Sequence, residues 1–274
     1  MSGILYLVAT PIGNLDDITL RAINILKEAH FIAAEDTRHS LKLLNHLGIS
    51  KPLISYHRHN EDIKTENLIE KLKDNKNIAL ITDAGTPGIS DPGEEIVKQA
   101  IENNIKIVPI PGACAFVNAL ICSGLDTTEF TFLGFLPLNK KNRKDQLEKV
   151  KNANSTVILY EAPHKLLSTL KDLEQITEDR KIVLARELTK IHEEFLYGTA
   201  NELLEKIDNP KGEFVILIEK SNNLETNNLD FLNNLSLEEH YNFYSKHGLN
   251  KNEIIKKIAK DRKVNKNEIY QKFI

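Results

Sequence analysis

The chain has little of what marks several classes of protein: its 274 residues include two cysteines, one methionine and no tryptophan. Cys114 and Cys122 lie eight positions apart in one apolar segment, without clustered histidines beside them. Such a pair provides neither a disulfide framework nor a zinc site, so we expect no metal and two small thiols in the core. The first apolar run, residues 4–9, is too short for a signal peptide or a membrane span and follows no basic segment. We therefore expect a cytoplasmic protein.

The net charge is also small, at −3, so the molecule as a whole is not an electrostatic binder of nucleic acid. Residues 246–274 differ from the rest, because nine Lys and Arg against three acids give this segment +6 and leave −9 elsewhere. Such asymmetry indicates an anionic partner for the C-terminal segment, although a solvated basic surface gives the same pattern. The hydrophobic fraction of 41% is sufficient for a buried core.

The first part of the chain alternates runs of β-forming residues with amphipathic helical patterns. The patterns predict strands at 4–9, 31–34, 53–56, 78–82 and 105–110, and helices at 17–28, 37–47, 62–73 and 93–103. This alternation is typical of βαβ units and a mainly parallel sheet. After a small-residue helix at 113–123, a second α/β unit is predicted, with strands at 130–135, 156–160, 181–185, 193–197 and 213–219.

These patterns predict an α/β protein in four parts. They are an N-terminal α/β domain at 1–111, a second α/β domain at 112–220, a linker at 221–235 and a tail at 236–274. The linker is predicted because six of its first fourteen residues are asparagine. Three short helical patterns in the tail, with a basic surface, suit a helix-turn-helix module, and a small helical cap packed on the main body suits them equally well.

The segment 83–93, Asp-Ala-Gly-Thr-Pro-Gly-Ile-Ser-Asp-Pro-Gly, follows a predicted buried strand and precedes a helix. In an open α/β sheet, ligands bind outside the carboxyl ends of the strands. Three glycines let a ligand approach the backbone closely, and two prolines stiffen the loop. The pattern is neither the dinucleotide fingerprint GxGxxG nor the phosphate loop GxxxxGK[ST]. We therefore predict a ligand loop of another kind, the alternative being an ordinary turn.

Other predicted strand ends carry similar loops or tight sets of polar residues. Gly- or Pro-containing segments at 8–15, 111–115 and 160–164 indicate a cleft between the two domains. Charged residues gather at 34–39, 56–61 and 185–190, although in the first of these Asp36 or Thr37 also suits a helix cap. Lys140, Lys141, Arg143 and Lys144 are predicted to form a basic loop that suits phosphate recognition, or an ordinary exposed loop.

Taken in order, these segments resemble the tetrapyrrole (corrin/porphyrin) methylase superfamily, and within it the enzymes that methylate a cytidine 2′-OH of bacterial 16S ribosomal RNA. The resemblance covers about residues 5–219, and the tail resembles the helix-turn-helix extension of many members. The chain departs from the family in having Ala113-Cys114 where members often have Pro-Ser. Seven ordered motifs carry the resemblance, at residues 7–15, 34–38, 82–93, 108–112, 134–137, 161–164 and 185–190.

The resemblance implies two α/β domains of tetrapyrrole-methylase type, a ligand cleft between them, a C-terminal helical module and a homodimer. It further implies that S-adenosylmethionine lies in the cleft, held largely by backbone groups. The donor contacts that it implies are Pro11, Gly85, Thr86, Pro87, Ile89, Ala113, Cys114, Ala115, Tyr160, Glu161, Leu188, Gly212 and Glu213.

A ribose 2′-OH is a poor nucleophile that gains from a base or a cation that lowers its pKa. The candidates for these roles are Glu35, Asp36, Arg38, His57, Glu161, Arg186, Glu187 and Lys190. Lys140, Lys141 and Arg143 are expected to meet phosphates of the small-subunit RNA, and the tail to add non-specific affinity. Two other functions fit the sequence: methylation of a small tetrapyrrole or precorrin, and non-catalytic nucleic-acid binding through the tail.

Overall fold

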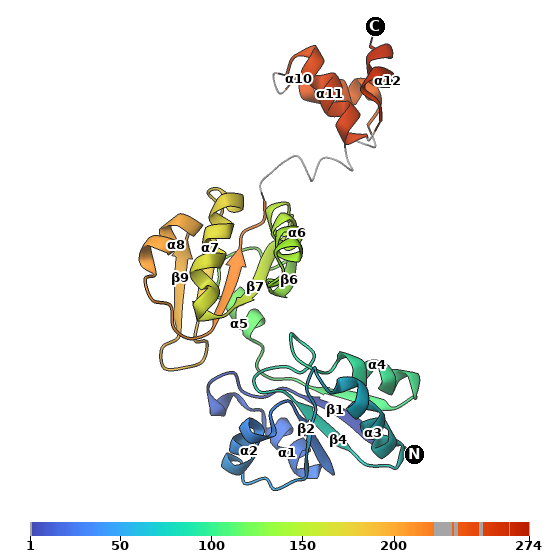
Figure 1. Ribbon diagram of the computed structural model, residues 1–274, viewed down its shortest axis with the longest axis vertical. Coiled ribbons are helices and arrows are strands. Elements are labelled where there is room, and N and C mark those ends of the chain that lie inside the picture. The colour runs from blue at the N-terminus through green and yellow to red at the C-terminus, as the bar shows by residue number, and fades with distance from the viewer. Residues whose placement is uncertain (1, 222–231, 233–234, 247–248, 263, 274) are drawn as a thin grey trace.

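The computed structural model describes residues 2–221, 232, 235–246, 249–262 and 264–273. Two sheets of five strands each lie one beyond the other along the long axis of the molecule, and a small helical unit lies beyond the second sheet (Figure 1). Helix α5 (Ala115–Ile121) lies at the junction of the two sheets. Within the described ranges, no helix is long and apolar enough to cross a membrane.

The first unit contains a parallel sheet, as its alternating pattern predicts. Its strands follow the order β3-β2-β4-β1-β5, and buried hydrophobic clusters cover both faces, as is usual for parallel sheets. The strands are β1 (Ile4–Val8), β2 (Phe31–Ala34), β3 (Leu53–Ser55), β4 (Ile78–Ile81) and β5 (Lys106–Ile110). The helices are η1 (Leu15–Asp17), α1 (Leu20–Glu28), α2 (Thr37–His46), α3 (Glu61–Lys73) and α4 (Glu94–Glu102). The carboxyl ends of β1, β2 and β4 meet at the edge that faces the second unit.

The second unit contains a mixed sheet in the order β6-β7-β10-β8-β9, in which β6 and β7 alone are parallel. All five residues of the central strand, β10, are buried. The strands are β6 (Phe130–Phe135), β7 (Thr156–Glu161), β8 (Ile182–Arg186), β9 (Glu194–Gly198) and β10 (Phe214–Ile218). The helices are α6 (Lys140–Lys151), α7 (Pro163–Thr177) and α8 (Ala200–Lys206).

The tail forms three helices with a hydrophobic core of their own: α10 (Leu237–Lys246), α11 (Lys251–Asp261) and α12 (Lys266–Gln271). Tyr244, Ile255 and Ile258 are among the buried members of this core. Most of the predicted linker lies outside the described residues. Leu232 and Leu235, which belong to the predicted linker, pack in the core of the tail.

The structure corrects two expectations about side chains. The predicted basic loop is the first turn of α6, where the Asn139 side chain accepts hydrogen bonds from the amides of Lys141 and Asn142 and so begins the helix. The two cysteines are free thiols, but they are not core residues: Cys122 is exposed and Cys114 is half-buried in the wall of a pocket. The segment around them is apolar because α5 covers the second sheet with its other face.

Candidate functional site

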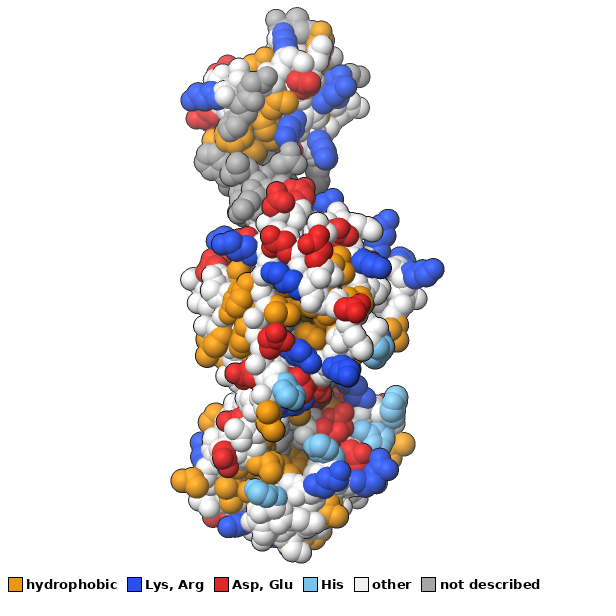
Figure 2. All heavy atoms as spheres, turned by 90° about the vertical axis from the view of Figure 1, so that its left-hand side faces the viewer, with side chains coloured by type: hydrophobic (Ala, Val, Ile, Leu, Met, Phe, Trp, Pro, Cys, Tyr) orange, Lys and Arg blue, Asp and Glu red, His pale blue; other side chains and the backbone are white. Residues whose placement is uncertain are grey.

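A pocket of about 560 Å³ lies between the two units, at the carboxyl ends of β2 and β4. The ligand loop predicted at 83–93 forms one side of it, together with Glu35 at the end of β2. Residues of α5, β7, β10 and the connection after β8 form the other side. Its size and largely apolar surface are those of a site for a small organic ligand. Figure 2 shows the hollow between the two units, with Lys, Arg and His side chains gathered around it beside acidic ones.

Three carboxylates, which we call the acidic wall, line the pocket from the first unit: Glu35, Asp83 and Asp91. Glu35 accepts a hydrogen bond of 2.7 Å from the buried hydroxyl of Thr82 at the end of β4. Asp83 accepts a hydrogen bond of 3.1 Å from the amide of Asp36, which fixes the loop against the end of β2. The parallel order of β2 and β4 therefore brings the three carboxylates to one edge of the sheet.

Asp91 differs from an ordinary surface carboxylate. Burial, chiefly, and the negative charge of Glu35 raise its pKa to about 6. The guanidinium of Arg58 acts in the opposite direction and also donates a hydrogen bond to the carbonyl of Ser90, the residue before Asp91. A carboxylate with a pKa near 6 accepts protons at neutral pH and still releases them readily.

The opposite side, which we call the second-unit wall, is mostly apolar and aromatic. The ring of Tyr160 contacts Phe132 and Phe135 edge-on, and its hydroxyl accepts a hydrogen bond of 3.3 Å from the amide of Phe116. Burial raises the pKa of Tyr160 well above its usual value, so the phenol stays protonated. Leu188 and Val215 complete this wall.

Glu161, which also belongs to the second-unit wall, is buried with 4% exposure, and protein groups engage both of its oxygens. Oε1 accepts from the amide of Ala162 at 2.9 Å, and Oε2 accepts from the Thr169 hydroxyl at 2.5 Å. Thr169 in turn accepts from Arg143 at 2.9 Å, and Arg143 pairs with Asp172 at 2.6 Å. This chain of contacts from α6 and α7 holds Glu161 in place.

Arg143, one of the three residues expected to meet phosphates, is therefore bound to protein groups of α7. Its side chain is 19% exposed and faces α7. Lys140 and Lys141 are exposed in the first turn of α6, which follows Phe135 of the pocket by a short connection. Of the three, only the two lysines face solvent where an RNA phosphate could reach them.

Most residues implied as donor contacts meet in this pocket. Pro11, Pro87, Ala113 and Gly212 do not line it, although Ala113 accepts a hydrogen bond from the Thr86 hydroxyl at 3.1 Å. The nine that line it are Gly85, Thr86, Ile89, Cys114, Ala115, Tyr160, Glu161, Leu188 and Glu213.

Of the eight proposed catalytic residues, Glu35 and Glu161 line the pocket and six do not. Asp36 caps α2, as its alternative interpretation predicts, and hydrogen bonds from Arg38 hold its pKa at about 2. The side chain of Arg38 is 89% exposed. His57 contacts Asn60 through its backbone amide and its Nε2. None of these three side chains reaches the pocket surface.

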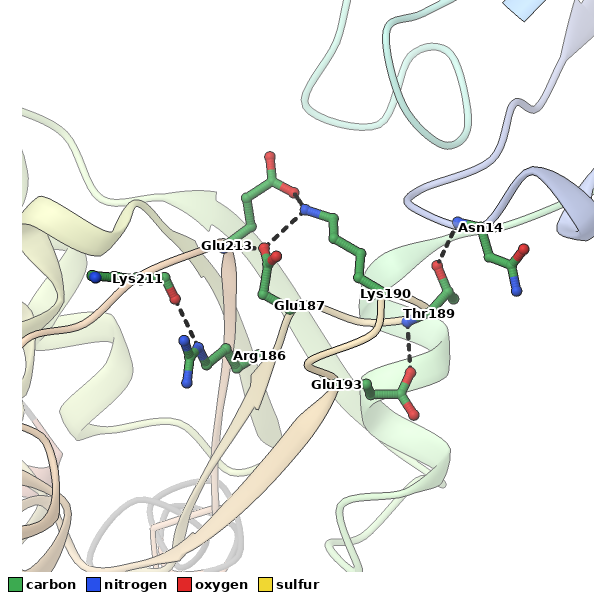
Figure 3. Close-up of polar contacts among 8 residues, drawn as sticks. All are labelled: Asn14, Arg186, Glu187, Thr189, Lys190, Glu193, Lys211 and Glu213. Atoms are coloured by element: carbon green, nitrogen blue, oxygen red, sulfur yellow. Dashed lines mark hydrogen bonds and ion pairs between the residues drawn. The ribbon is translucent and has the colours of Figure 1, made fainter. Parts of the chain in front are cut away.

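The remaining three candidates lie around the turn that follows β8 (Figure 3). Arg186 donates to the carbonyl of Lys211 at 2.7 Å and pairs with Glu194 at 3.2 Å. Lys190 lies between Glu187 and Glu213, with contacts of 2.8 and 2.9 Å. These charged groups satisfy one another, and only Glu213 also borders the pocket.

Sequence reasoning missed Asp83 and Asp91 as individual candidates, although both lie in the predicted ligand loop. The available signal was two carboxylates in a loop otherwise made of Gly, Pro, Ala, Ile, Ser and Thr. Ile12, Phe135 and His164 also line the pocket and carry no pattern that distinguishes them from other residues of such loops. In the parts of the chain that the structure describes, no group of three or more His, Cys, Asp or Glu is placed to hold a metal ion.

Comparison with known proteins gives a family model and several relatives. The model of the Tetrapyrrole (Corrin/Porphyrin) Methylases matches residues 4–204. A Halalkalibacterium halodurans protein named Ribosomal RNA small subunit methyltransferase I is 48% identical over 270 residues, or 98% of this chain and 93% of that one. A Bacillus subtilis protein of the same name is 47% identical over 274 residues, or 99% and 94%. A Haemophilus influenzae protein of that name is 51% identical over 224 residues, or 80% and 79%.

Solved structures share the fold at much lower identity. A diphthine synthase has a TM-score of 0.64 and 16% identity, covering 80% of this chain and 91% of that one. A uroporphyrin-III-C-methyltransferase from Thermus thermophilus has a TM-score of 0.54 and 20% identity, covering 78% and 94%. The fold of this chain is thus shared with a diphthine synthase and a uroporphyrin-III-C-methyltransferase.

Proposed function

The chain belongs to the tetrapyrrole (corrin/porphyrin) methylase family, and we propose that it transfers a methyl group from S-adenosylmethionine to the ribose 2′-OH of a cytidine in 16S ribosomal RNA. The observation that carries the proposal is the composition of the pocket. Nine of the thirteen expected donor contacts line it, and the three carboxylates of the acidic wall line it beside them. The names of relatives that match nearly the whole chain support ribosomal RNA rather than a tetrapyrrole as the acceptor. A cytoplasmic homodimer is part of the same proposal.

The pocket suits S-adenosylmethionine in size and in chemistry. A volume of about 560 Å³ accommodates a nucleoside with an amino-acid chain. Ile12, Ile89 and Leu188 offer apolar surface for the adenine and ribose, and the acidic wall favours a ligand with positive charges. Bound there, S-adenosylmethionine supplies a methyl group on a positively charged sulfur.

Residues of the chain position the donor, accept the proton of the acceptor and exclude water. Gly85, Thr86 and Ala115 hold the donor through a stiff loop and the start of α5, so that the acceptor meets it in one orientation. Asp91 accepts the proton of the ribose hydroxyl at its carboxylate, for which a pKa of about 6 is well suited. Glu35 keeps the pKa of Asp91 raised, and Thr82 orients Glu35. The apolar second-unit wall limits the access of water to the reacting groups.

The test is transfer of labelled methyl groups from S-adenosylmethionine to small ribosomal subunits, or to their naked RNA, from cells that lack this protein. We expect one 2′-O-methylated cytidine in 16S RNA, mapped by its resistance to alkaline cleavage. A precorrin-type tetrapyrrole in a parallel reaction should remain unlabelled. Label on the tetrapyrrole alone would contradict the choice of acceptor, and calorimetry that detects no binding of S-adenosylmethionine would contradict the enzyme itself.

A further inference from the structure

The turn after β8, residues 187–190, has an unusual backbone. Glu187 and Thr189 adopt left-handed conformations, with φ of 49° and 66°. A β-branched residue such as threonine is a genuine outlier there, because its side chain crowds the backbone. Such a conformation persists only where surrounding contacts enforce it. Between these two residues, Leu188 is directed into the wall of the pocket.

Lys190 enforces the turn from within the second unit. Its ammonium group lies between the carboxylates of Glu187 and Glu213, and Oε1 of Glu187 also accepts from the amide of Glu213 at 2.9 Å (Figure 3). Burial alone would lower the pKa of Lys190, but the hydrogen bonds to both carboxylates raise it above its usual value. The amine is therefore protonated at neutral pH and cannot serve as a proton acceptor. Its contacts hold the turn to the beginning of β10.

Thr189 joins the turn to the first unit. Its Oγ1 accepts a hydrogen bond of 3.1 Å from the amide of Asn14, 175 positions earlier in the chain (Figure 3). The two loops meet so closely that a Cβ on Gly13 would lie 2.4 Å from Cγ of Lys190 and 3.1 Å from the carbonyl oxygen of Leu188. Neither neighbour is the free end of a flexible side chain, so only glycine permits this approach.

We propose that Thr189 and Lys190 are positioning residues that lock the 187–190 turn against the loop 12–14 and thereby fix the width of the pocket. Ile12 and Leu188 both line the pocket, one from each unit, next to the locked contact. The strained turn and the bond from Asn14 thus set the distance between two surfaces that hold the same ligand. The inference rests on the proposed function for the identity of that ligand, S-adenosylmethionine, and it assigns Glu187 and Lys190 to the scaffold rather than to proton transfer.

The contact between the 187–190 turn and the loop 12–14, which we call the lock, can be examined first without any ligand. Hydrogen exchange of the Asn14 amide should accelerate about tenfold in Thr189→Val, which keeps the shape of the side chain but removes the acceptor. Thr189→Ser, which keeps the hydroxyl, is the matched control and should exchange like the wild type. Thr189→Gly removes both the strain and the hydroxyl, and we expect exchange as fast as in the valine variant. Wild-type exchange in Thr189→Val would overturn the proposal.

Ligand binding gives the second test. Calorimetry should show that the Kd for S-adenosylmethionine rises about fivefold in Thr189→Val and in Lys190→Met, and at least as much in Gly13→Ala. Each substitution weakens the contact between the 187–190 turn and the loop 12–14. The rate of a single turnover on small subunits at saturating donor should stay within about threefold, with the pH profile unchanged. Lys190→Arg should restore most of the affinity.

The outcomes separate the lock from the proposed function. A wild-type chain that binds no S-adenosylmethionine contradicts the proposed function, while the exchange experiment still decides the lock. If the wild type binds and methylates, but the Lys190→Met variant keeps its donor affinity and loses the single-turnover rate, then Lys190 acts in the chemistry and the positioning role is overturned. Thermal unfolding of every variant identifies any that are not folded, and exchange of the Asn14 amide in the folded variants, compared with Thr189→Ser, then decides the proposal.

Discussion

The two sides of the pocket hold their carboxylates in different ways. On the second-unit wall, Glu161 receives hydrogen bonds at both oxygens, and Glu213 beside it is paired with Lys190. On the acidic wall, Asp91 is half-buried near Glu35, and its pKa rises to about 6. A carboxylate whose oxygens are engaged by donors is held in one position, whereas one whose pKa is raised by burial and a like charge exchanges protons near neutral pH. We therefore propose that the first unit carries out proton transfer and that the second unit positions the ligand.

The sharpest way to break this comparison is to neutralise Asp91. We expect Asp91→Asn to lower the single-turnover methylation rate at saturating donor by about 100-fold or more, the usual contribution of a positioned base. The Kd for S-adenosylmethionine should change little, because the donor contacts lie mostly elsewhere in the pocket. Asp74→Asn, the same change at an exposed helix end, is the control. A rate within threefold of the wild type would remove Asp91 from the reaction.

The pH dependence sharpens the same point. A base must be deprotonated to act, so below a pKa of about 6 the rate should fall roughly tenfold per pH unit, and above it the rate should level off. The residual rate of Asp91→Asn should be flat across this window. The measurement is single-turnover methylation between pH 5 and 8, with thermal unfolding recorded at each pH to show that the protein stays folded. A wild-type profile that is flat down to pH 5 would exclude a base with this pKa.

The support behind Glu161 is expected to have a smaller effect. Arg143→Met removes the guanidinium that donates a hydrogen bond to Thr169 and pairs with Asp172, both contacts being partly buried. The loss should lower the free energy of unfolding by about 2 kcal/mol. The affinity for S-adenosylmethionine should fall about fivefold, because Glu161 is then held less firmly in the pocket. Denaturant titration and calorimetry measure the two effects. Lys144→Met, on the exposed side of the same helix, should change neither, and an unaffected Arg143 variant would show that Glu161 needs no support.

Much of the fold was predictable from the sequence, because periodicity reports which face of each element is buried. Strands 31–34 and 130–135 begin and end where the patterns predict. The basic segment after Pro137 was predicted as a loop because α6 is mostly exposed, and only Leu147 and Val150 of its residues join the second-unit core. A solvent-facing helix has little hydrophobic signal, and its clearest mark was Asn139 at the cap.

The location of the site was predictable from the sequence, but the role of each charged residue in it was less so. Loops at strand ends identified the cleft, since strand order brings those ends together. The charged residues at 186–190 carry the same residue types as a catalytic cluster, and their mutual pairing becomes visible only in three dimensions. The raised pKa of Asp91 was likewise hidden, because it depends on burial and on Glu35, which is far away in the sequence. Contacts between residues far apart in the sequence therefore decide which charged side chain is available for the reaction and which one stabilises the structure.

The smallest predicted effect concerns the two exposed lysines at the start of α6. Lys140 and Lys141 are exposed at the start of α6, and if each meets an RNA phosphate, their removal should weaken RNA binding a fewfold. Lys140→Gln with Lys141→Gln should also reduce the slope of log Kd against log salt by about 1.4, at roughly 0.7 per contact with single-stranded RNA. The matched control is Lys149→Gln with Lys151→Gln, which removes the same charge from the other end of the same helix.

An equal change of slope in both double variants would indicate a diffuse effect of charge, whereas a change in the first alone would locate the RNA at the start of α6. Neither pair should alter the Kd for S-adenosylmethionine, since none of the four lysines lines the pocket. Titrations of small-subunit RNA at several salt concentrations measure the slopes. An unchanged slope in the first pair would confine substrate recognition to the first unit or the tail, and with it the acidic wall would become the only part of the pocket expected to meet the acceptor.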